Sequence, residues 1–184
     1  QAGDLLWQDG LGAGVQMALF DAVGKTLGVP AYSLLGDKVR EWCPLSWWGI
    51  DMPSADWARQ CADAVKQGYA SAKLKARTWY DLHDAIGAIL KVVPEQFKLD
   101  LDFNGTLADA ASAVEFLKTL ERYEQVAMIE SPIPQGDVIG NRHIRDRINR
   151  PLAMHYGSPA PATVIEQDVA DGFVVCAGAR NITK

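Results

Sequence analysis

Four polar residues stand at nearly regular intervals along the chain, each at the end of a short apolar run. They are Lys75, Asp102, Glu130 and His155, separated by 27, 28 and 25 residues. A strand, a helix and their two connections together take about this length of chain. Because the carboxyl ends of successive parallel strands meet at one mouth of a sheet, we expect these four side chains to approach one another there.

The run SAKLKA at 71–76 places two lysines on one face of an expected strand. Strand alternation turns Lys73 and Lys75 to one side and Leu74 to the other. If that side is the interior of a barrel, mutual repulsion and desolvation both lower the pKa of an ammonium. One lysine then becomes a usable base near neutral pH. The alternative is an edge strand with two solvated lysines.

Carboxylates end the next two expected strands. In LDLDFNG, Asp100, Asp102 and Asn104 share one face, and their oxygens suit a hard cation such as Mg²⁺. Asp and Asn before Gly are also ordinary turn formers. Glu130 ends the apolar run VAMIE, and the two prolines in 131–134 stiffen the loop that follows. A Glu that caps the next helix is the alternative here.

The composition describes an ordinary globular chain with a sizeable core. Of 184 residues, 48% are hydrophobic, and 18 Lys and Arg against 23 Asp and Glu give a net charge of −5. The scattered positive charges argue against nucleic acid or an anionic membrane as a partner. No apolar run approaches the roughly 18 residues of a membrane-spanning helix, and the first residues lack a secretion signal. We therefore expect a cytoplasmic protein, and the odd set of Cys43, Cys61 and Cys176 fits reduced thiols.

Short apolar runs alternate with amphipathic stretches, which predicts parallel βα units. Strands are expected at 42–48, 71–76, 97–103, 126–130, 151–155 and 172–176. Six strands are more than half of a (β/α)8 barrel, which usually needs about 250 residues. The sequence thus predicts either part of a longer barrel chain or an open sheet.

Two helices have clear sequence signals. In the first, Val15, Leu19, Val23 and Leu27 form an apolar stripe that ends at Gly28. In the second, Ser54 is the expected N-cap and Gly68 the expected residue just beyond the C-terminus.

Taken together, the chemical motifs resemble the enolase superfamily, in its mandelate racemase and muconate lactonizing group. The matching motifs are Lys73-x-Lys75, Asp102-x-Asn104 and Glu130-Ser-Pro, and the segment 18–40 is similar to that group's lead-in to the barrel. The resemblance implies an α/β fold of the (β/α)8 TIM-type barrel class. About six βα units would be present at 41–184 after a helical lead-in at 1–40, without the N-terminal capping domain.

The resemblance also implies a function. It predicts a Mg²⁺-dependent isomerase or lyase, namely a racemase, cycloisomerase or acid dehydratase, that removes the proton α to a carboxylate through an enediolate. Lys75 would be the general base, and Lys73 would tune its pKa or touch the substrate carboxylate. Asp102 and Glu130 would bind the metal, with Asn104 as a supporting contact. Mn²⁺ is the alternative ion. A small carboxylate substrate and a homo-oligomer are the expected partners.

Two positions depart from the family pattern. Where the family places a third carboxylate ligand, this chain has Tyr156 with His155 beside it. Neither suits Mg²⁺, whereas His155 suits Zn²⁺ or Mn²⁺, or is a hydrogen-bonded histidine under a loop. Cys176 stands where cycloisomerase-like members carry a second acid/base lysine, and a buried cysteine is usually inert.

These departures leave two alternative interpretations open. One is a non-catalytic or impaired relative, or a fragment, that acts as a binding or structural protein. The other is an unrelated open α/β domain whose lysines and carboxylates are solvated.

Overall fold

The structure, a computed structural model, describes residues 2–157 and 159–175. Within the chain, contacts define two compact units, one formed mainly by residues up to Pro44 and the other by Leu45–Val174. The second unit holds all six strands and every polar residue that the motifs singled out, except Cys176, which lies outside the described residues.

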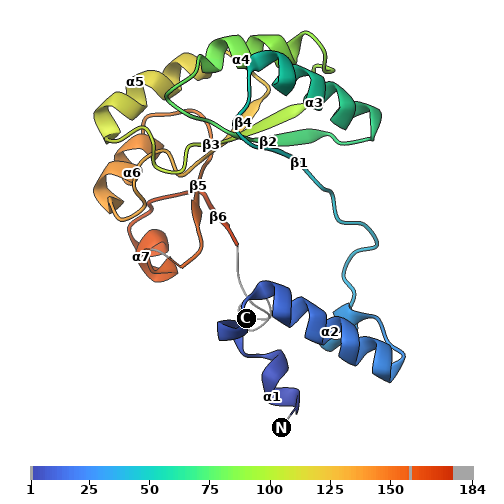
Figure 1. Cartoon of the computed structure of the whole chain (residues 1–184). Coiled ribbons are helices and arrows are strands. Elements are labelled where there is room, and N and C mark those ends of the chain that lie inside the picture. The colour runs from blue at the N-terminus through green and yellow to red at the C-terminus, as the bar shows by residue number, and fades with distance from the viewer. Residues whose placement is uncertain (1, 158, 176–184) are drawn as a thin grey trace. The chain divides into compact units, whose positions relative to one another are not determined.

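The second unit is built on a parallel sheet whose strands pair in chain order (Figure 1). The strands are β1 (Trp47–Gly49), β2 (Ser71–Lys75), β3 (Lys98–Asp102), β4 (Val126–Glu130), β5 (Leu152–His155) and β6 (Gly172–Val174). A parallel sheet in which each strand joins the next one along the chain is the arrangement of a (β/α) barrel. The alternation of runs therefore predicted the architecture correctly.

Five helices connect these strands and lie along one side of the curved sheet in Figure 1. They are α3 (Ser54–Lys66), α4 (Leu82–Leu90), α5 (Ala110–Leu120), α6 (Val138–Arg145) and α7 (Pro161–Glu166). Aspartates cap three of them, because a carboxylate accepts the free N–H groups of the first turn. Asp81 caps α4, Asp109 caps α5 and Asp137 caps α6.

The predicted N-cap of α3 is wrong, whereas the predicted C-terminal end of the helix is confirmed. Ser54 is the first helical residue, and Pro53 occupies the cap position without a side-chain hydrogen bond. The extended backbone of Pro53 leads directly into the helix, so no hydroxyl cap is needed to set its start. Gly68 follows the helix in the left-handed region, at φ 87°, as expected.

The first strand is shorter and later than predicted. Residues 41–46 have no strand structure, and β1 begins only at Trp47. Pro44 lies in the middle of the predicted run and lacks the N–H that a sheet ladder needs. The apolar side chains on either side of it, Trp42 and Leu45, are exposed.

The core fills the layer between the sheet and its helices. Leu74, Leu99, Leu101 and Ile129 on the strands are at most 1% exposed, and they join a cluster that includes Trp57 of α3. Since neighbouring side chains on a strand point to opposite faces, the polar residues between these apolar ones turn to the other face of the sheet. The fold thus gathers lysines and carboxylates on one concave side.

The first unit contains α1 (Ala2–Leu6), α2 (Ala13–Leu27) and two short 3-10 turns. Gly28 ends α2 at φ 70°, as predicted. The helix that the apolar stripe predicted is confirmed, but the stripe is not its buried face: Val15 and Leu27 are more than half exposed, while the buried residues are Gln16, Phe20 and Gly24. A Cβ on Gly24 would lie 2.9 Å from the carbonyl oxygen of Val29, so the close backbone approach at this buried position requires a glycine.

Cys43 is exposed and Cys61 is buried, and both are free thiols. Among the described helices, none has the length and apolar character that crossing a membrane requires.

Candidate active site

The carboxyl ends of four neighbouring strands carry the four residues that the spacing predicted. β2 ends at Lys75, β3 at Asp102, β4 at Glu130 and β5 at His155. Lys75 pairs in register with Asp102, and Asp102 pairs with Glu130. The parallel register therefore brings Lys75, Asp102 and Glu130 to one level at the mouth of the sheet, and His155 lies two residues beyond Ala153, the register partner of Glu130.

Asp102 is the centre of the cluster and is fully buried. Its Oδ2 atom lies 2.5 Å from Nζ of Lys75 and 3.3 Å from Nζ of Lys73. Its Oδ1 atom accepts the backbone N–H of Asn104 at 3.0 Å. Burial by itself raises the pKa of the Asp102 carboxyl, but the contacts with both lysines and Asn104 outweigh it and lower the pKa. Asp102 is therefore ionised.

Glu130 is the second fully buried carboxylate. Nζ of Lys73 lies 2.5 Å from its Oε2 atom, and Nε2 of His155 lies 2.9 Å from its Oε1 atom. Both are close contacts between a potential cation and a carboxylate, and the contact with Glu130 is one cause of the raised pKa of Lys73. Glu130 thus reaches the mouth with Lys73 and His155 against its two oxygens.

The pKa of Lys73 differs from the value expected for two neighbouring lysines. Burial lowers the pKa of its ammonium, but the attraction of Glu130 and Asp102 is larger in sum, so the pKa lies above its usual value. The lowered pKa that mutual repulsion predicted is wrong for Lys73, because the spacing of lysines alone does not reveal how near the carboxylates stand. Lys73 is a permanent cation in this arrangement.

Asp100 lies on the same face of β3 as Asp102, two residues earlier in the strand. Burial raises the pKa of its carboxyl, Lys73 lowers it, and the charge of Glu130 raises it further. The balance is a raised pKa. Asp100 does not belong to the cluster of potential metal ligands.

Three residues form a potential metal site. Asp102, Glu130 and His155 each offer one ligand atom, and these atoms all lie within 4.8 Å of one another. Two carboxylate oxygens suit a hard divalent cation, and an imidazole nitrogen suits a transition ion. The burial of both carboxylates agrees with a cation at this place. The donor set fits a divalent metal ion.

The two other predicted neighbours of the site have different surroundings. Oδ1 of Asn104 accepts hydrogen bonds from Nζ of Lys75 at 3.0 Å and from the guanidinium of Arg77 at 2.8 Å. Tyr156 does not join the cluster among the described contacts. The residue is 43% exposed, and its ring packs edge-on against Phe173, with 5.6 Å between the ring centroids. The structure brings His155, and not Tyr156, to the carboxylates.

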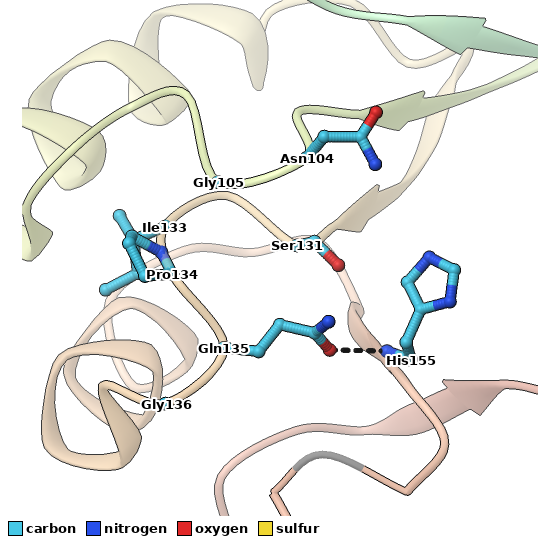
Figure 2. Close-up of a pocket in the computed structure, with 8 residues that line it drawn as sticks. All are labelled: Asn104, Gly105, Ser131, Ile133, Pro134, Gln135, Gly136 and His155. Atoms are coloured by element: carbon cyan, nitrogen blue, oxygen red, sulfur yellow. Dashed lines mark hydrogen bonds between the residues drawn. The ribbon is translucent and has the colours of Figure 1, made fainter.

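Sequence reasoning missed Arg77 and Gln135. Arg77 donates to the carbonyl oxygen of Asp102 at 3.1 Å, as well as to Asn104. The alternation of Lys73, Lys75 and Arg77 was a signal that could have found it. Gln135 accepts the backbone N–H of His155 at 2.7 Å through its Oε1 atom (Figure 2). A contact from a loop to a strand end has no comparable sequence signal.

A cavity of about 310 Å³ opens beside the cluster. Its lining residues come from the loops after β3 and β4 and from the end of β5, and they are Asn104, Gly105, Ser131, Ile133, Pro134, Gln135, Gly136 and His155. In Figure 2 the side chains of Asn104, Ser131 and His155 face a common space. The Ser131 hydroxyl is buried without a hydrogen-bond partner in the described structure. The cavity can receive a small polar group.

Comparison with known proteins identifies the family. The family model of enolase C-terminal domain-like proteins, from the mandelate racemase and muconate lactonizing group, matches residues 56–165. The chain belongs to this family, and the resemblance drawn from its motifs is confirmed. The (β/α)8-type barrel, of which the six-stranded sheet is a part, is confirmed with it.

Several characterised proteins are similar to the chain. N-succinyl-L-Arg/Lys racemase of Bacillus cereus is 26% identical over 163 residues, which cover 86% of this chain and 44% of the relative. D-galactonate dehydratase of Variovorax paradoxus is 35% identical, over 66% of this chain and 34% of that protein. A solved enolase from Bradyrhizobium, complexed with magnesium and mandelic acid, has a TM-score of 0.70 and 26% identity, covering 88% of this chain and 46% of its own. The chain thus spans less than half the length of these relatives.

Proposed function

We propose that this chain carries the metal-binding and proton-transferring part of an isomerase or lyase that removes the proton α to a carboxylate. The observation that carries the proposal is the meeting of two lysines with two fully buried carboxylates at the ends of β2, β3 and β4. Membership of a family that contains a racemase and a dehydratase supports it.

Asp102 and Glu130, with His155 beside them, would hold the divalent cation, either Mg²⁺ or Mn²⁺. A magnesium ion in the solved Bradyrhizobium enolase supports a divalent cation at this place. When bound, the cation supplies positive charge to a substrate carboxylate whose α-carbon is losing a proton.

The two lysines have separate tasks. Lys73 remains protonated because Glu130 and Asp102 raise its pKa, so it offers a fixed positive charge to a substrate carboxylate. Lys75 is the remaining candidate base: after its Nζ has released one proton to water, the free amine accepts the α-proton there. Oδ1 of Asn104 accepts a hydrogen bond from Nζ of Lys75, so it positions the base.

The remainder of the substrate would occupy the cavity beside the cluster. The cavity is lined by the Asn104 and Gln135 amides and the Ser131 hydroxyl, which recognise hydroxyl or amide groups. The named relatives and the liganded structure suggest three carboxylates for a first screen, namely N-succinyl-arginine, D-galactonate and mandelate.

Solvent exchange at the α-carbon tests the proposal. The purified protein is incubated in D2O with Mg²⁺ or Mn²⁺ and each carboxylate, and loss of the α-proton signal is followed by ¹H NMR. Wild type and Lys98→Ala, an exposed lysine at the opposite end of β3, are expected to exchange at equal rates. Lys75→Ala is expected to lose exchange and keep metal binding. Equal rates in wild type and Lys75→Ala would contradict the role of Lys75.

A relative that binds carboxylates without catalysis is the second candidate. The observation in its favour is that the ammonium groups of Lys73 and Lys75 lie against Asp102 and Glu130 and offset their negative charge. Saturable binding of a carboxylate by calorimetry, without α-proton exchange of any bound compound, is the result that this candidate predicts.

A further inference from the structure

We propose that His155 makes this centre select a divalent cation that accepts an imidazole nitrogen, such as Mn²⁺ or Zn²⁺, over Mg²⁺. The inference rests on the proposed function, since it assumes that a cation lies among Asp102, Glu130 and His155. It concerns which ion this particular chain uses and which residue decides it.

The ring of His155 lies close enough to the Glu130 carboxylate for both groups to bind one ion. Its Nε2 atom is 2.9 Å from Oε1 of Glu130, and the three potential ligand atoms lie within 4.8 Å of one another. Neighbouring ligands of an octahedral ion with bonds near 2.1 Å lie about 3 Å apart. The spacing of His155 and Glu130 therefore matches two adjacent positions around one ion.

The backbone that carries this ring is held in place. His155 is the last residue of β5 and pairs with Val174 of β6. Its backbone N–H donates to Gln135, as Figure 2 shows. Tyr156, which follows it, packs against Phe173 and leaves the position by Glu130 to the imidazole.

Glu130 has the surroundings of a carboxylate that shares a cation. Its side chain is fully buried, with Nζ of Lys73 2.5 Å from Oε2 and Nε2 of His155 2.9 Å from Oε1. A buried carboxylate is costly unless positive charge or hydrogen bonds compensate it. A metal ion between Glu130, Asp102 and His155 would add positive charge beside that of Lys73.

The chemistry of the three ligands disfavours Mg²⁺. Two carboxylates and a neutral imidazole carry a charge of −2, and the ammonium groups of Lys73 and Lys75 stand beside them. Mg²⁺ depends on oxygen ligands and on charge, and it keeps water in preference to nitrogen. Mn²⁺ and Zn²⁺ gain more from an imidazole than Mg²⁺ does.

Calorimetric titration of Mg²⁺, Mn²⁺ and Zn²⁺ into the purified protein tests the inference. The variants are His155→Asp, which makes the ligand set all oxygen, and Tyr156→Asp, which places the same carboxylate one residue away. We expect His155→Asp to shift the ratio of the Mg²⁺ and Mn²⁺ dissociation constants toward Mg²⁺ by on the order of tenfold or more, since even outer-shell partners change metal affinity by that much. Tyr156→Asp is expected to leave the ratio unchanged, because in this structure Tyr156 packs against Phe173 and the described ligand cluster contains His155 at this strand end.

A spectroscopic readout separates ligation from a general charge effect. With Mn²⁺ bound, electron spin echo spectra are expected to show coupling to an imidazole ¹⁴N nucleus in wild type and Tyr156→Asp. The coupling is expected to be absent in His155→Asp and in His155→Asn. The Asn variant adds no charge and serves as the second test if the Asp variant does not fold.

The outcomes distinguish this inference from the proposed function. An unchanged ratio in His155→Asp, or ¹⁴N coupling that persists without His155, would overturn the role of His155. In that case, metal binding that Glu130→Gln removes would still support the centre itself. If wild type and all variants bind none of the three ions, both the inference and the proposed metal centre are wrong.

Discussion

Lys75 and Asp102 are register partners at the ends of two adjacent parallel strands, and their charged groups lie 2.5 Å apart. The contact follows from the sheet itself, because β2 and β3 end at these residues and neither side chain has to be carried by a loop. Residues on strands are held more firmly than residues on loops. A base and a metal ligand built in this way have a fixed mutual geometry.

Replacing Lys73 with Met is expected to destabilise the metal-free protein and to strengthen metal binding. Lys73 is the cation that lies against Glu130 and also approaches Asp102. Without it, the buried Glu130 carboxylate loses an opposite charge, which costs about 2 kcal/mol of unfolding free energy for a partly exposed partner. The midpoint of thermal unfolding should therefore fall without metal.

Added Mn²⁺ should raise that midpoint more in Lys73→Met than in wild type, because no ammonium competes for the Glu130 oxygens. Lys98→Met serves as the control, since Lys98 is exposed at the other end of the sheet. An equal metal-induced shift in wild type and Lys73→Met would contradict the claim that Mn²⁺ and the Lys73 ammonium compete for the Glu130 oxygens.

Cys61 is expected to make the stability of the protein depend on pH in the alkaline range. Burial raises the pKa of its thiol from 9.0 to about 11. Between these values the unfolded chain releases a proton that the folded chain keeps. The free energy of unfolding should therefore fall as the pH rises from 9 to 11.

Denaturant unfolding of wild type, Cys61→Ala and Cys43→Ala at several pH values checks this effect. The decline should be shallower in Cys61→Ala, whereas Cys43→Ala should follow wild type because Cys43 is exposed. Parallel declines in all three proteins would show that the Cys61 thiol ionises alike in the folded and unfolded states.

The sequence predicted the strand ends of the barrel well, because two signals agreed there. Alternation fixed the face of each strand, and the regular spacing marked where each strand stops. Lys75, Asp102, Glu130 and His155 accordingly end β2 to β5. These residues depend on local pattern and parallel register alone.

Features that depend on tertiary contacts were predicted poorly. The buried face of α2 includes Phe20, which packs against Trp7, and Gly24, where the backbone approach is close. The raised pKa of Lys73 depends on carboxylates 29 and 57 residues further along the chain. Periodicity contains no information on such approaches.

Metal titration into wild type, Glu130→Gln and Asp100→Asn tests the central claim most directly. Glu130 belongs to the cluster of ligand atoms, whereas Asp100 lies on the same face of the sheet outside it. Our account predicts micromolar-to-millimolar binding of Mn²⁺ by wild type and Asp100→Asn, and loss of that binding in Glu130→Gln, all measured by calorimetry on folded protein. Undiminished binding by Glu130→Gln would contradict a metal centre at the ends of these strands.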